Sequence, residues 1–163
     1  MLVLAEKLQE LSFSGLMAVY AEGNRENAED FWPELSENER LLRAEESFYQ
    51  YLKESFFKTP GAVYALWLCR GEYVAALRLE PYEDGLLLEA LETHPKERRR
   101  GYATALLKAV LERFPQMIYS HVGKRNVASL KVHEKCGFRI IKDHARYIDG
   151  SVNTNAWTLC CDK

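Results

Sequence analysis

The chain has 163 residues, 47% of them apolar and 28% charged, with a formal net charge of −2. This length suits one domain with a full core, so residues 1–163 are predicted to form a single domain. The mildly acidic balance argues against a dedicated nucleic-acid binder, and no apolar run is long enough to span a membrane. Residues 1–10 become charged too early for a signal peptide, so we expect a cytoplasmic protein whose four cysteines are reduced core thiols without metal-ligand spacing.

The first third of the chain is expected to be helical after a short edge strand over residues 1–5. Ser12 can cap a first helix, and Gly23 can end it. The capping box "SENE" at residues 36–39 opens a second helix, which the sequence "TPG" stops at Thr59.

From residue 62 the apolar spacing becomes that of strands. Residues 62–69 and 72–80 flank Arg70 and Gly71, a two-residue hairpin signal. Residues 86–93 follow the turn "YEDG". This pattern predicts a three-stranded antiparallel meander.

Helical spacing then returns over residues 101–114, ahead of Pro115. A helix that crosses between two strands usually makes them parallel neighbours, so residues 117–122 are expected to lie parallel to residues 86–93.

The chain is expected to finish with a short helix stopped by Gly137 and a hairpin of residues 138–148 and 154–161. The resulting order is β-α-α-β-β-β-α-β-α-β-β. It predicts an α/β (α+β) fold with a mixed, mostly antiparallel sheet of six to seven strands and helices on both faces.

The sequence "KERRRGYATALL" crowds cations against the start of the helix expected from residue 101, where the helix dipole disfavours them. Gly101 allows positive φ, and the first-turn amides have no acceptor within the helix, so this end suits a phosphate group. Arg98, Arg99 and Arg100 add positive charge around it. We therefore predict an anionic ligand here, with a solvated charge cluster at a loop tip as the alternative.

Two short motifs point to one family. Arg98, Gly101 and Ala103 match the Gln/Arg-x-x-Gly-x-Gly/Ala signature of the GNAT N-acetyltransferase superfamily, after a strand and at the start of a helix. The stretch "NVASLKVHEKCGF" is similar to the family's second signature. The residues that match there are Asn126, Ser129, Glu134, Lys135, Gly137 and Phe138. The chain thus resembles this superfamily, most closely over residues 86–138.

The resemblance implies acetyl-CoA, or another acyl-CoA, as cofactor, and direct transfer of its acyl group to a primary amine, most simply that of a small molecule. The pyrophosphate would lie at the Gly101 helix start. The pantetheine arm would lie between splayed parallel strands, residues 86–93 and 117–122. The predicted cofactor-binding residues are Leu91, Glu92, Thr93, Arg98, Arg99, Arg100, Gly101, Tyr102, Ala103, Thr104, Asn126 and Ser129.

Transfer to an amine needs a base for the amine proton and an acid for the departing thiolate. Glu89 is the predicted base, with Glu92 as the alternative, because a bulge can change which of them faces the cleft. A structural glutamate is the competing interpretation for both. His133 replaces the family's usual tyrosine on a helix stripe with Asn126 and Ser129, and is the predicted acid. The alternative is a partly buried histidine bonded to neighbouring backbone, with solvent as the acid.

Tyr20, Trp32 and Tyr147 are predicted to line the substrate site, although aromatic residues at such spacing are as often core. Phe31 and Tyr49 are further candidates. The remaining histidines, His94, His121 and His144, are expected to be structural or exposed.

Other functions stay open at this point. A catalytically weak or inactive acyl-CoA-binding sensor on the same frame would bind CoA without turnover, and a protein or peptide N-acetyltransferase would need a long groove. Nucleic-acid binding through the arginine run ranks last, since an extended basic face is missing from the sequence. A homodimer is also left open.

Overall fold

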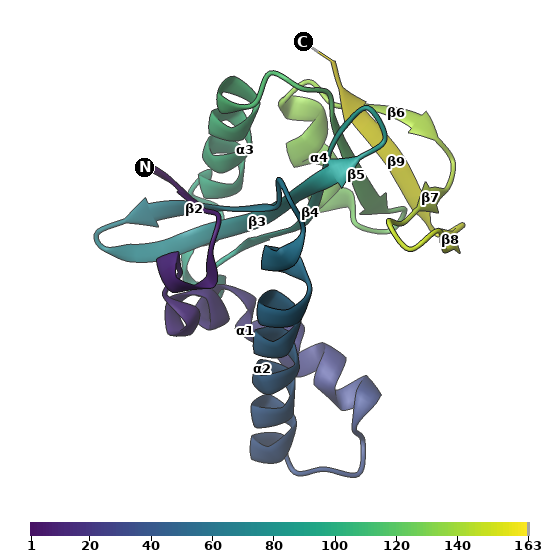
Figure 1. The fold of residues 1–163 in the computed structure, drawn as a ribbon. Helices are drawn as coiled ribbons and strands as arrows, with labels where there is room; N and C mark the ends of the chain where they lie inside the picture. Colours follow the sequence, from purple (N-terminus) through teal and green to yellow (C-terminus); the bar gives the residue numbers. More distant parts are fainter. Residues whose placement is uncertain (163) are drawn as a thin grey trace.

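The computed structural model describes residues 1–162. Its strands are β1 (Leu2–Ala5), β2 (Val63–Cys69), β3 (Glu72–Tyr82), β4 (Gly85–Thr93), β5 (Ile118–Gly123), β6 (Arg139–Lys142), β7 (Ala145–Arg146), β8 (Val152–Asn153) and β9 (Ala156–Cys161). Its α-helices are α1 (Phe13–Phe31), α2 (Glu37–Glu54), α3 (Tyr102–Arg113) and α4 (Val127–Lys135). Helices α1 and α2 lie on one side of the sheet, and α3 and α4 on the other (Figure 1).

Seven strands form one sheet in the order β1-β2-β3-β4-β5-β9-β6, and β7 pairs with β8 in a separate ribbon. All neighbours in the large sheet are antiparallel except β4 and β5. This parallel pair runs in register from Leu86 beside Ile118 to Leu88 beside Ser120. The predicted mixed, mostly antiparallel sheet with helices on both faces is confirmed.

The first helix is longer than predicted. Gly23 lies inside α1, which continues to Phe31. A glycine inside a helix costs only about 1 kcal/mol, and packing can offset that cost. Here Ala28, 1% exposed, anchors the last turns, and Pro33 is the residue that prevents further continuation. The α1–α2 hairpin therefore projects from the sheet (Figure 1).

The C-terminal hairpin is also shorter than predicted. Residues 138–148 do not form one strand. β6 pairs with β9 with a register shift between Ile140 and Lys142, and β7 pairs with β8 instead. The backbone leaves the sheet at His144, whose carbonyl oxygen accepts a hydrogen bond from Thr158 Oγ1 at 2.6 Å.

The two faces of the sheet carry two apolar clusters. Leu77 and Leu79 of β3 belong to the cluster under α3, whereas Ala76 belongs to the cluster under α1 and α2. Because side chains alternate along a strand, Arg78 and Glu80 also face α1 and α2. Two charged residues thus lie where the sheet meets the helical hairpin. Among residues 1–162, no helix is both long and apolar enough to cross a membrane.

Candidate active site

The predicted anion cradle is present at the start of α3. Gly101 is its N-cap residue with φ of 80°. A Cβ at this position would meet nothing within 4 Å among the described residues, so glycine is required for its backbone conformation rather than for space. The first helical hydrogen bond runs from Ala105 N to Gly101 O at 2.9 Å. The amides of residues 102–104 therefore point out of the helix end, where the dipole favours an anion.

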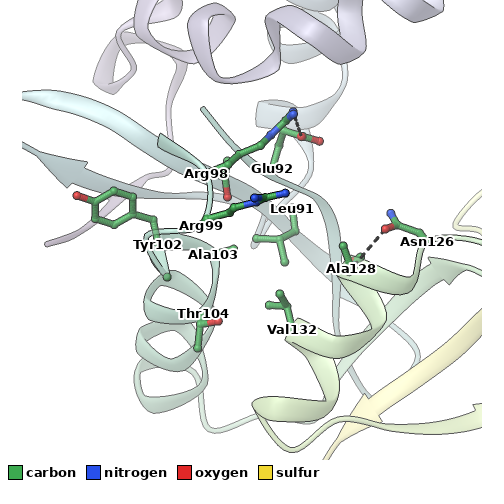
Figure 2. A pocket seen from close by; sticks show the side chains of 13 residues that line it. Leu91, Glu92, Arg98, Arg99, Tyr102, Ala103, Thr104, Asn126, Ala128 and Val132 are labelled. Atoms are coloured by element: carbon green, nitrogen blue, oxygen red, sulfur yellow. Dashed lines mark hydrogen bonds and ion pairs between the residues drawn. The ribbon is translucent and has the colours of Figure 1, made fainter. Parts of the chain in front are cut away.

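A cavity of about 550 Å³ opens between α3, α4 and the end of β4 (Figure 2). Its lining is Leu91, Glu92, Thr93, Arg98, Arg99, Gly101, Tyr102, Ala103, Thr104, Asn126, Ala128, Ser129 and Val132. Every predicted cofactor-binding residue except Arg100 is brought together here. The Tyr102 ring points away from α4 in Figure 2, and its hydroxyl lies 3.4 Å from Cys69 Sγ, so this residue contributes chiefly its backbone.

The three arginines are not equivalent. Arg98 pairs with Glu22 at 3.0 Å and with Glu92 at 3.6 Å, the latter contact being drawn in Figure 2. Arg100 pairs with Glu97 at 3.0 Å and lies outside the cavity lining, so the structure does not bring it together with the other predicted cofactor-binding residues. Over residues 1–162 Arg99 makes no ion pair. Its charge is thus the one most available to an anion at the cradle.

A β-bulge at Ala90 shapes the end of β4. Ala90 has φ of 53°, and the register with β3 shifts, so that Glu89 lies opposite Arg78 and Glu92 opposite Ala76. Both β3 residues face α1 and α2, so Glu89 and Glu92 share that face. The sequence did not decide which of the two glutamates faces the cleft. In the structure the bulge places both glutamate side chains on the same side of the sheet.

Tyr20 supports this bulge. Its hydroxyl donates to Ala90 O at 2.7 Å and accepts from Tyr64 Oη at 2.9 Å. Tyr20 is only 9% exposed. It therefore holds α1 against the bulged strand, and, although predicted to be a substrate residue, it lines neither the cavity between α3 and α4 nor the one between α1, α2 and β3.

The environment of Glu89 suits a proton acceptor. Burial, and then the neighbouring Glu80 carboxyl, raise the pKa of Glu89 to about 7, although Arg78 acts in the opposite direction. A base works best when its pKa lies near the working pH. Burial also raises the pKa of Glu92, but Glu92 is ion-paired with Arg98. Glu89 is thus the better candidate.

His121, expected from the sequence to be structural or exposed, lies close to Glu89 in the sheet. The last parallel pair is Leu88 with Ser120, so Glu89 and His121 are the next residues on either side of the fork where β4 and β5 part. Ile118 and Val122 of β5 belong to the cluster under α3. By alternation, His121 lies on the same side of the sheet as Glu89, where its ring contacts Tyr82 and Tyr147. The alternation of side chains along residues 117–122 is the sequence signal that could have placed His121 on the same side as Glu89.

His121 and Tyr147 contact each other on this side of the sheet. The His121 ring lies 5.2 Å from that of Tyr147, and burial lowers the pKa of His121. The other two histidines have local partners. His94 Nδ1 accepts a hydrogen bond from Lys96 N at 3.2 Å, and His144 Nδ1 lies 3.0 Å from Asp143.

The predicted orientation of His133 is wrong. His133 is 1% exposed and does not line the cavity. Its Nδ1 donates to Ser129 O at 2.7 Å, so Nε2 accepts from Ser120 Oγ at 2.8 Å in the neutral tautomer. Residue 133 lies about 10 Å along the helix axis from Asn126, where α4 packs on β5 instead of facing the cavity. His133 is thus a buried histidine bonded to backbone, which is the alternative interpretation that the sequence left open.

Replacing His133 by phenylalanine is expected to lower the free energy of unfolding by about 1–3 kcal/mol, because Ser120 Oγ and Ser129 O lose their partner. Burial lowers the pKa of His133 below its ordinary value of 6.5. Its contribution to stability is therefore present above pH 6.5 and is lost as pH falls through the folded-state pKa. Denaturant unfolding across this range, with the partly exposed His144→Phe as the control, should show a weaker pH dependence in His133→Phe. Loss of turnover with unchanged stability would instead restore His133 as the acid.

A second cavity, of about 710 Å³, lies between α1, α2 and β3. Its lining is Asn24, Asn27, Ala28, Phe31, Trp32, Ala44, Ser47, Phe48, Tyr51 and Arg78. The structure thus places the predicted substrate residue Trp32, and the further candidate Phe31, at this cavity. Tyr49 lines a different groove on α2.

Solved structures share this fold. A protein of Pyrococcus horikoshii OT3 aligns with a TM-score of 0.66 and 15% identity over 100% of this chain and 99% of its own. Aminoglycoside 6'-acetyltransferase type Ii aligns with a TM-score of 0.65 and 14% identity over 99% and 96%. PaiA N-acetyltransferase from Thermoplasma acidophilum, solved with coenzyme A, aligns with a TM-score of 0.60 and 12% identity over 100% and 99%.

Among curated proteins, none matches the sequence. The family model described as "Acetyltransferase (GNAT) family" matches residues 24–138, more than half of the chain. The predicted cofactor, acetyl-CoA, agrees with this match and with the coenzyme A bound in the Thermoplasma structure. The predictions of the fold and of an acyltransferase are confirmed, because the chain belongs to the GNAT acetyltransferase family.

Proposed function

We propose that this protein transfers the acetyl group of acetyl-CoA to the primary amine of a small molecule. The observation that carries the proposal is the β4 bulge. It lies between the anion cradle of α3 and the carboxyl of Glu89, whose pKa is raised to about 7. A diphosphate site and a base thus flank one strand end, as transfer from an acyl-CoA to an amine requires.

The residues of the first cavity fit coenzyme A. Gly101 and the amides of residues 102–104 provide the donors that a diphosphate accepts, and Arg99 supplies a positive charge. Residues 91–93 line the same cavity beyond the last β4–β5 pair. Their backbone groups on the β5 side would pair with the pantetheine arm.

Glu89 would take a proton from the acceptor. The amine nitrogen forms a bond to the acyl carbon while the carbon–sulfur bond breaks. Of the two protons that an ammonium acceptor loses, the first passes to Glu89 before the attack, and the second, lost as the amide forms, passes through solvent to the departing thiolate. Acetyl-CoA, when bound, supplies an acyl group activated as a thioester. Burial of His133 is the reason for assigning the last proton to solvent.

Release of the CoA thiol from acetyl-CoA, screened over amino acids, polyamines, aminoglycosides and short peptides, tests the proposal. We expect amine-dependent release with at least one small-molecule class. Release with peptides alone would favour a peptide N-acetyltransferase. Binding of acetyl-CoA without turnover on any amine would favour the sensor alternative and contradict the proposal.

A further inference from the structure

Three buried polar atoms lack a hydrogen-bond partner among residues 1–162: Arg78 Nε, Glu89 Oε2 and His121 Nε2. Buried polar groups are nearly always paired, so an unpaired one requires an explanation such as a missing ligand. These three lie on β3, β4 and β5, which are adjacent in the sheet, and they share the side of the sheet on which α1 and α2 lie. A chance defect would not be expected to recur on three neighbouring strands of one face.

Of these three residues, Arg78 is the one that lines the cavity between α1, α2 and β3. Its guanidinium lies over the rings of Tyr51 at 5.1 Å and Phe48 at 6.0 Å, and its side chain is 17% exposed. Nε lies 3.9 Å from Glu89 Oε2, too far for a hydrogen bond. Arg78 also lines the cavity together with the aromatic residues Trp32, Phe48 and Tyr51. A cation with an open donor thus lies at the edge of an aromatic cavity.

Arg78 has the Glu89 carboxylate at ion-pair distance, 3.9 Å, and although burial lowers the pKa of Arg78, the nearby Tyr64, Tyr20 and Tyr51 hydroxyls and Glu89 raise it. The nearest carboxylate, that of Glu89, has a pKa raised to about 7 by burial and by Glu80, so it carries a proton for part of the time near neutral pH. A buried cation without a full counter-charge favours an anion as ligand. A carboxylate suits it best, because the planar guanidinium fork matches two carboxylate oxygens.

We infer that the acceptor is an amino acid with an apolar or aromatic side chain, whose carboxylate binds Arg78 while its ammonium group binds Glu89. Arg78 and Glu89 are directly opposite on adjacent strands, about 5 Å apart at the backbone, a spacing that suits groups attached to one carbon atom. The side chain would pack against Phe48, Tyr51 and Trp32, whose rings bury apolar groups. This inference rests on the proposed function and deepens it.

The opposing charges also explain how an amino acid would become reactive. Its amine enters as an ammonium ion, which must lose a proton before it can attack the thioester. Glu89 both attracts the ammonium and accepts that proton, with Glu80 beside it. Because Arg78 holds the carboxylate on the β3 side, the nitrogen is directed toward the fork between β4 and β5, where Glu89 and His121 end the paired region.

Pairs of acceptors that differ only in the carboxylate test the inference. We would measure kcat/KM for L-phenylalanine and 2-phenylethylamine, and for L-leucine and 3-methylbutylamine, at saturating acetyl-CoA. The wild-type protein is expected to prefer each amino acid by about 100-fold, the magnitude of a charge-assisted two-point contact. Arg78→Met should remove this preference by lowering only the amino-acid values, and exposed Arg113→Met is the matched control.

The outcomes separate the inference from the proposed function. Equal wild-type rates for an amino acid and its amine would overturn the inference while leaving the acetyltransferase in place. An equal loss for both acceptors in Arg78→Met would also overturn it, since Arg78 would then act only by supporting Glu89. No turnover of any amine would overturn both. The wild-type comparison decides the matter even if Arg78→Met fails to fold, and Arg78→Lys, which keeps the charge but not the fork, should retain part of the preference.

Discussion

Replacing Glu89 by glutamine is expected to lower kcat/KM for acetyl transfer by about 10²- to 10³-fold, the usual contribution of a general base. Affinity for acetyl-CoA should not change, because Glu89 does not line the α3–α4 cavity. The variant keeps the size of the side chain and removes only its ability to accept a proton. Exposed Glu112→Gln on α3 is the matched control.

The pH dependence makes this prediction sharper. Only ionised Glu89 accepts a proton, so wild-type kcat/KM should rise through about pH 7 and level off above it. Stability should move the other way. The folded-state pKa lies above the ordinary value of 4.5, so the stability contributed by protonated Glu89 is lost as pH rises through about 7. Glu89→Gln should therefore be at least as stable as wild type above that pH. A variant with the wild-type rate and pH profile would exclude Glu89 as the base.

Placing a carboxylate at Ala103 is expected to raise the KM for acetyl-CoA by about 100-fold while leaving the protein as stable as before, or more so. An acidic side chain in the first turn of a helix is favourable by about 0.3–1 kcal/mol. In Ala103→Asp it would occupy the position proposed for the diphosphate, so attraction becomes repulsion. Binding and stability are thus predicted to move in opposite directions.

Ala109→Asp provides the contrast on the same helix. Its carboxylate lies nearer the C-terminal end of α3, where the dipole disfavours it, and outside the cavity lining. It should lower stability without changing acetyl-CoA affinity. Titration calorimetry and denaturant unfolding of both variants check this. Unchanged acetyl-CoA affinity in Ala103→Asp would contradict the placement of the diphosphate at α3.

The cofactor cavity was predictable because its residues are local in sequence. Gly101 requires its backbone conformation, and the arginines beside it act through a helix end that the same residues begin. A segment of about ten residues therefore contains most of the physical reason for the site. The sequence did not separate Arg100 from Arg98 and Arg99, because a charge run does not reveal which of its members pairs with a neighbour such as Glu97.

The acceptor side was less predictable because it depends on contacts between distant segments. Arg78, Glu89 and His121 come from three strands and meet only through the sheet order. Helical spacing placed His133 on the stripe of Asn126 correctly, but it carries no information about where along its axis a helix changes from cavity to core. The bulge at Ala90 depends on pairing with β3 and on the Tyr20 hydroxyl.

Transfer of an isotopically labelled acetyl group from acetyl-CoA tests the central claim most directly. The protein would be incubated with labelled acetyl-CoA and L-phenylalanine or 2-phenylethylamine, and both products would be measured by mass spectrometry. We predict an N-acetylated amine that carries the label, formed in equimolar amount with free CoA and lost in Glu89→Gln. Free CoA without an acetylated amine, or no CoA release with these acceptors or any amine class of the screen although acetyl-CoA binds, would contradict the assignment as an amine acetyltransferase.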